Sequence, residues 1–92
     1  MQLKPNSRAA LETWLVPTWD SGHALDEERF YKFVNQYQND HGFSINEADL
    51  RDEIKRTAVA KGRPFGTHQE NLVHDCVSLA YKILDFLKTT GR

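Results

Sequence analysis

The 92-residue sequence has a single cysteine, Cys76, and no apolar run that approaches the roughly 20 residues that a membrane-spanning helix needs. A lone cysteine cannot form an intramolecular disulfide, which excludes a disulfide-stapled scaffold and suits a reducing compartment. The first residues, MQLKPNSRAALETW, contain no apolar segment of the kind that a secretory signal requires. We therefore expect a cytoplasmic protein that does not enter the membrane.

The sequence also lacks any long alternation of apolar and β-branched residues with polar ones, the pattern that is typical of strands. It contains no internal repeat and no low-complexity segment. Apolar residues make up 39% of the chain and charged residues 27%, and the formal net charge is −1. This composition is typical of a globular domain with no general attraction to nucleic acid. The length predicts one domain over residues 1–92.

The helical signals, in contrast, are repeated and consistent. They predict an all-α fold, a small four-helix array, with helices at about residues 8–16, 26–40, 46–61 and 68–89.

Residues at the expected helix ends support these bounds. The expected N-caps are Asp26, Asn46 and Thr67. Glu70 follows Thr67 at the spacing of a capping box. Because proline lacks an amide proton and clashes with the preceding turn, Pro17 is expected to end the first helix. Gly42 and Gly62 are expected to end the second and third helices, since glycine readily adopts the left-handed conformation that follows a helix.

The fourth helix is more apolar than an ordinary surface helix. At 100° per residue its apolar side chains cover about 180° of arc, whereas a surface helix needs a stripe of about 100°. These side chains are Leu72, Val73, Cys76, Val77, Leu79, Ala80, Ile83, Leu84, Phe86 and Leu87. Either this helix is central in the array, or it shares the surplus with another chain, for example as the seam of a homodimer.

Charge is distributed unevenly along the chain. Residues 20–53 contain nine acids and three bases, a net charge of −6, and residues 54–69 contain four bases and no acid. Nucleic-acid binding needs Lys and Arg on one surface, because neutralising phosphates supplies much of the affinity. Lys55, Lys61 and Arg63 therefore form the alternative hypothesis, a weak nucleic-acid-binding module. Under the competing interpretation these cations only solvate the surface.

Arg63 and His68 are separated by four residues in RPFGTH. This pair resembles the R-x4-6-H motif of HEPN domains, which are small, all-helical, usually dimeric, and in many cases RNases. The resemblance covers six residues and implies that Arg63 stabilises phosphate charge while His68 acts as a general acid or base. Pro64 stands where the family commonly has a polar residue, and Gly66 loosens the geometry of the pair.

Other chemistry has little support in the sequence. Glu70 and His74 are one turn apart, but Asp75 points about 100° away, and a transition-metal site converges three or four ligands. Cys76 lies in an apolar run, where burial raises the pKa of a thiol and makes it inert. We expect no metal, no cofactor and no catalytic residue, and an enzymatic role is not favoured.

The remaining class is a non-enzymatic protein–protein interaction or regulatory domain, with another protein or a second copy as partner. Its candidate contacts are the aromatic residues Trp19, Tyr31 and Phe65, and Leu79 and Phe86 of the fourth helix. Aromatic residues commonly anchor interfaces, and the acidic flanks would favour a basic partner. Under the competing interpretation, Trp19 and Phe65 close the ends of a small core.

Overall fold

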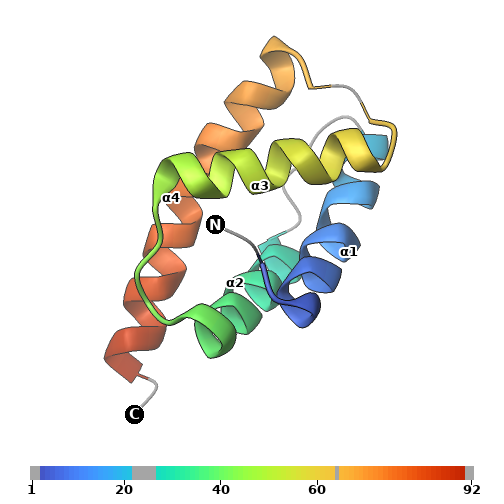
Figure 1. Cartoon of the computed structure of the whole chain (residues 1–92). Coiled ribbons are helices and arrows are strands. Elements are labelled where there is room, and N and C mark those ends of the chain that lie inside the picture. Colours follow the sequence, from blue (N-terminus) through green and yellow to red (C-terminus); the bar gives the residue numbers. More distant parts are fainter. Residues whose placement is uncertain (1–2, 22–26, 64, 91–92) are drawn as a thin grey trace.

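The computed structural model of the chain describes residues 3–21, 27–63 and 65–90 (Figure 1). Four α-helices lie in these ranges: α1 (Pro5–Ser21), α2 (Glu27–His41), α3 (Glu47–Ala60) and α4 (Thr67–Thr90). No strand occurs in the described ranges. The radius of gyration is 12.3 Å, and about 12 Å is expected for a compact single domain of this length. The predicted all-α fold is confirmed.

Three of the predicted helix ends are confirmed by their hydrogen bonds. The side chain of Asn46 caps α3 by accepting the backbone N–H of Asp49 at 3.1 Å. Gly42 follows α2 with a φ of +90°, and Gly62 follows α3 with a φ of +72°. Backbone N–H groups of Gly62 and Arg63 donate to carbonyls of the last turn of α3, as in a Schellman motif. The expected cap of α2, Asp26, lies outside the described residues.

The prediction that Pro17 ends the first helix is wrong. Helix α1 continues through Pro17 to Ser21 and also begins earlier than expected, at Pro5. A proline inside a helix loses one backbone hydrogen bond and costs about 3 kcal/mol. The extra turn carries Thr18, Trp19 and Asp20, and the last two contact the connection between α3 and α4. These long-range contacts offset the cost of the proline.

The start of α4 differs by one residue from the prediction. Gly66 is the N-cap, since its carbonyl accepts the N–H of Glu70 at 3.0 Å, and Thr67 is the first helical residue. The side chain of Gln69, at the third helical position, accepts the N–H of Gly66 at 2.9 Å. Gln69 thus performs the part of the capping box that reaches back to the cap. The predicted Thr67–Glu70 box is therefore wrong, and the Glu70 carboxylate instead lies 3.9 Å from Arg51.

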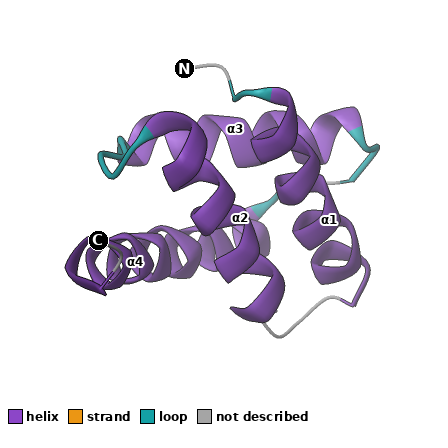
Figure 2. Cartoon of the chain, turned by 90° about the horizontal axis from the view of Figure 1, so that it is seen from below, coloured by secondary structure: helices purple, strands orange, loops and turns teal. Residues whose placement is uncertain are grey.

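Helices α1 and α4 lie on opposite sides of the molecule. Each packs against both α2 and α3, and within the described ranges the backbones of α1 and α4 do not approach one another. Helix α3 crosses the other helices in Figure 1, and Figure 2 shows α2 between α1 and α4. The interpretation that α4 is the central helix is therefore wrong. Its surplus of apolar residues is not explained by burial on all sides.

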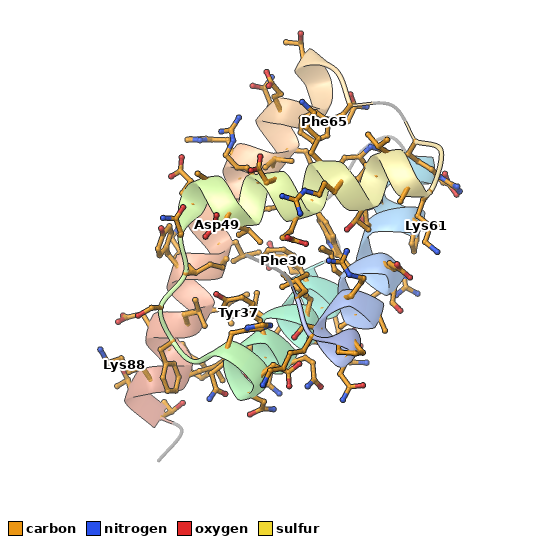
Figure 3. All side chains as sticks on the ribbon, viewed as in Figure 1. Phe30, Tyr37, Asp49, Lys61, Phe65 and Lys88 are labelled. Carbon is orange, nitrogen blue, oxygen red and sulfur yellow. The ribbon has the colours of Figure 1, made fainter. Side chains whose placement is uncertain are left out.

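The core lies where the inner faces of the four helices meet. Trp14, Phe30, Phe33, Leu50 and Ile54 are fully buried, and the Trp14 and Phe30 rings lie 5.0 Å apart. Figure 3 shows Phe30 and Tyr37 between the helices.

The carboxylate of Glu53 is buried beside this core. It is 1% exposed and lies 2.8 Å from Arg8 and 3.4 Å from Arg56. A buried charge is tolerated when it is paired in this way. The sequence did not single out Glu53, because its partner Arg8 is 45 residues away.

Candidate interaction surface

The basic connection between α3 and α4 is held against α1 by ion pairs. Arg63 donates from Nε and Nη2 to the two carboxylate oxygens of Asp20, at 3.1 and 2.9 Å. Its Nη1 also donates to the carbonyl of Lys61 at 2.7 Å. The Lys61 ammonium lies 3.4 Å from the carboxylate of Glu12. A two-point Arg–carboxylate pair fixes geometry as well as charge, so this connection is anchored to the middle and the end of α1.

This pairing also shifts the protonation of its two members. The hydrogen bond from Arg63 lowers the pKa of the Asp20 carboxyl, and the same bond raises the pKa of Arg63. Burial opposes both shifts but is the smaller influence. Asp20 therefore stays ionised, and paired with Arg63, to a lower pH than an ordinary aspartate does.

Trp19 and Phe65, two of the predicted partner contacts, pack on each other. Their rings are stacked with centroids 6.4 Å apart, and the Trp19 ring meets the edge of Trp14 at 6.1 Å. The Lys55 ammonium lies 5.8 Å from the centre of the Phe65 ring, within the range of a cation–π interaction. Both aromatic residues are partly buried against the core. This arrangement agrees with the competing interpretation, in which they close one end of the core.

The same end of the molecule contains all three cations of the nucleic-acid alternative. Figure 3 shows Lys61 at the end of α3 nearest α1, and Phe65 beside the start of α4. Lys61 and Arg63 already have carboxylate partners, and Lys55 lies over Phe65. A phosphate at this place would have to compete with Glu12 and Asp20. For the HEPN-like pair, Arg63 is engaged by Asp20, and the side chain of His68 lies outside what the structure describes.

The apolar face of α4 is different. Leu72, Leu79 and Phe86 recur every seven residues, so they lie in one line along the helix with a drift of about 20° per repeat. We call these three residues the outer stripe. Leu72 and Leu79 are partly buried against the core, whereas Phe86 is 55% exposed.

Contacts to α3 show which way the outer stripe faces. Glu70 lies near Arg51 of α3, and the Tyr81 hydroxyl donates to the carbonyl of Ile45, just before α3, at 3.1 Å. At 100° per residue, the outer stripe lies about 180° around α4 from Glu70 and Tyr81. It therefore lies on the flank that faces away from α3, along the seam with α2.

Tyr31 borders this seam from the other side. On α2, Gln36 and Asp40 mark the flank toward α1, because the Ser7 hydroxyl donates to Asp40 at 2.7 Å and Gln36 donates to the same carboxylate. Tyr31 lies about 140–180° around the helix from these residues, on the side where α4 packs. Tyr31 is 37% exposed. Three of the predicted contacts, Tyr31, Leu79 and Phe86, thus border one seam, and Trp19 and Phe65 lie elsewhere.

Neither the metal chemistry nor the thiol chemistry considered from the sequence gains support. The described residues contain no group of three or more His, Cys, Asp or Glu side chains that could hold a metal ion. Cys76 is fully buried, and this burial, with a smaller contribution from Asp75, raises the pKa of its thiol to about 12. A thiol in that state is not a nucleophile at neutral pH.

One polar cluster was not anticipated, at the start of α1 and the end of α2. The Ser7 hydroxyl, which is fully buried, donates to Asp40, and the His41 Nε2 accepts the backbone N–H of Lys4 at 3.2 Å. The hydrogen bond from Ser7 is the main cause of the lowered pKa of Asp40. His41 bonds to the backbone of Lys4 rather than to Ser7, so the cluster ties two helices together and is not a catalytic triad. Its partners are more than 30 residues apart, where local sequence patterns carry no signal.

Comparison of the chain with protein-family models, with curated proteins and with solved structures finds no match. None of the described helices is both long enough and apolar enough to cross a bilayer.

Proposed function

We propose that this protein is a non-enzymatic interaction domain that docks a protein partner on the outer stripe of α4, beside Tyr31 of α2. The observation that carries the proposal is the 55% exposure of Phe86 at the end of the outer stripe. Large aromatic side chains contribute disproportionately to interface energies when a partner buries them. The lone cysteine suits a cytoplasmic setting for this interaction.

The acidic start of α2 is adjacent to this surface. Glu27 and Glu28 are exposed in the first turn, and Glu27 precedes Tyr31 by one helical turn. Glu28 lies 3.7 Å from Lys32, so part of this charge is already paired. Such charges on the rim of an interface affect the association rate and the choice of partner more than the affinity.

The nucleic-acid alternative has less support. Each of the three cations on which it depends has a partner within the chain, whereas Phe86 is left largely uncovered by the fold. Phe86 lies near the end of α4, whereas Lys61 and Arg63 precede its start, so one set of variants separates the two hypotheses.

The test compares Phe86→Lys with a matched control, Val59→Lys. Val59 is 61% exposed on α3, and both positions lie near the C-terminal end of a helix, where a lysine is tolerated electrostatically. Circular dichroism first establishes that both variants are folded. Tagged wild-type and variant chains are then used to capture partners from host lysate, with and without nuclease. Any captured protein is identified and its binding is repeated with purified components.

We expect binding that survives nuclease, is lost in Phe86→Lys and is retained in Val59→Lys. Binding that is lost on nuclease treatment, or after charge reversal at Lys61 and Arg63 with Phe86→Lys unaffected, contradicts the proposal and favours the nucleic-acid alternative.

A further inference from the structure

The residues along the outer stripe of α4 are spaced nearly symmetrically about Leu79. Leu72 and Phe86 lie seven residues before and after it. Asp75 lies four residues before Leu79, and Lys82 lies three residues after it. At 100° per residue, Asp75 and Lys82 both lie about 40–60° to the same side of Leu79, the side away from the core. The apolar and the charged positions are therefore arranged about one centre.

Asp75 and Lys82 are available to a partner. Both are exposed, and neither forms an ion pair with another residue that the structure describes. Other charged residues on the molecule, such as Arg63 and Lys61, have carboxylate partners within the chain. Asp75 and Lys82 are thus two opposite charges beside an apolar line that the fold covers only in part.

We infer that the partner of the outer stripe is a second copy of this chain, docked antiparallel, α4 on α4, about a twofold axis near Leu79. This inference rests on the proposed function and names its partner. With the axis near Leu79, Leu72 of one copy lies level with Phe86 of the other, over a length of about 21 Å between the two ends of the stripe. Such an interface is isologous, since the same patch serves both copies.

The charges select the antiparallel arrangement. Antiparallel docking places Asp75 of each copy level with Lys82 of the other, on the same side of the stripe, so two opposite-charge pairs form. Parallel docking places Asp75 level with Asp75 and Lys82 level with Lys82, but on opposite sides of the stripe, so neither charge gains a partner of opposite sign. A single helix pair with three apolar positions and two ion pairs makes a small interface. We therefore expect a weak dimer, with a dissociation constant on the order of 100 µM.

The test is sedimentation equilibrium of the purified full chain, from low micromolar to about millimolar concentration. The variants Asp75→Lys and Lys82→Asp each place like charges at both contact points, and each should weaken self-association by about tenfold. An equimolar mixture of the two variants should associate like the wild type, because every contact between unlike chains again joins opposite charges. The double variant D75K/K82D should also associate with itself. Asp85→Lys, off the stripe on the same helix, is the matched control and should leave the dimer unchanged.

Three results would overturn the inference: a wild-type chain that stays monomeric at about 1 mM, a mixture that associates no better than either variant alone, or a dimer that Phe86→Lys does not weaken. The first of these leaves the proposed function standing if Phe86→Lys still abolishes capture of a different protein. If the wild-type chain is monomeric and capture is also insensitive to Phe86→Lys, both proposals are wrong.

Discussion

Two surface regions of this small domain, the α3–α4 connection and the outer stripe of α4, differ in how far the fold covers them. At the α3–α4 connection, which we call the covered end, Trp19 and Phe65 stack on each other, and the charges of Lys61 and Arg63 are paired with α1. Along the outer stripe of α4, Phe86 is left largely exposed. From composition alone the two places look alike, since both combine aromatic residues with charge. The difference lies in whether a distant segment of the chain returns to cover the residues.

The core side of α4 gives the strongest contrast with the outer stripe and the largest expected effect. Because the pKa of the Cys76 thiol is raised to about 12, only about 1 in 10,000 thiols is ionised at pH 8, against roughly a quarter for an unperturbed cysteine. We expect a thiol reagent to modify Cys76 at least about 1,000-fold more slowly than a free cysteine at this pH.

The rate of modification is measured with a thiol reagent that releases a chromophore, by following the absorbance over time with and without denaturant. Rapid modification of the native chain at neutral pH would mean that α4 is not seated on the core as described.

Trp19 and Phe86 make a direct comparison between a covered and an uncovered aromatic residue. Replacing Trp19 by alanine removes contacts with Trp14 and Phe65 and should lower the free energy of unfolding by about 2–3 kcal/mol. Replacing Phe86 by alanine should change it by no more than about 0.5 kcal/mol, because the ring is mostly in solvent. Urea unfolding followed by circular dichroism at low protein concentration checks both values. Equal costs at the two positions would remove the distinction between the two regions.

Replacing Pro17 tests whether the proline itself positions the last turn of α1 at the covered end. Replacing Pro17 with alanine restores a helical hydrogen bond and removes the clash of the proline ring with the preceding turn. Together these are worth about 3 kcal/mol, less about 1 kcal/mol for the freer unfolded chain. We expect a net gain of about 2 kcal/mol in the free energy of unfolding, measured by the same urea titration. A loss of stability would instead mean that the proline directs the last turn of α1 toward Phe65.

How far the sequence predicts this structure depends on the range of each interaction. Asn46, Gly42 and Gly62 were identified from the sequence because capping depends on residues within one turn. The continuation of α1 through Pro17 was missed because it depends on Arg63 and Phe65, more than 40 residues away. The same holds for the candidate surface. The wide apolar arc of α4 indicated surplus hydrophobic area, but only the packing of α4 on α2 and α3 shows that Phe86 is uncovered.

The smallest expected effect concerns the ion pair at the covered end. The folded-state pKa of Asp20 lies below its unfolded value, so the pair adds stability above the unfolded pKa of about 3.9, and this contribution is lost as the pH falls through the folded pKa. Asp20→Asn should therefore lower the melting temperature slightly near neutral pH and flatten its decline below about pH 4.

Asp40 of α2 is the matched control. Its pKa is also lowered, and it contacts Ser7 at the opposite end of α1 from Asp20, so Asp40→Asn should flatten the same decline without changing the environment of Trp19. Tryptophan fluorescence distinguishes the two, because the Asp20–Arg63 bond holds the segment that carries Trp19. An acid-induced change in fluorescence ahead of the loss of helicity, absent in Asp20→Asn and present in Asp40→Asn, would show that the covered end opens first. Fluorescence and helicity lost together in all three chains would mean that the contacts of Trp19 with Trp14 and Phe65 hold this end closed without the ion pair.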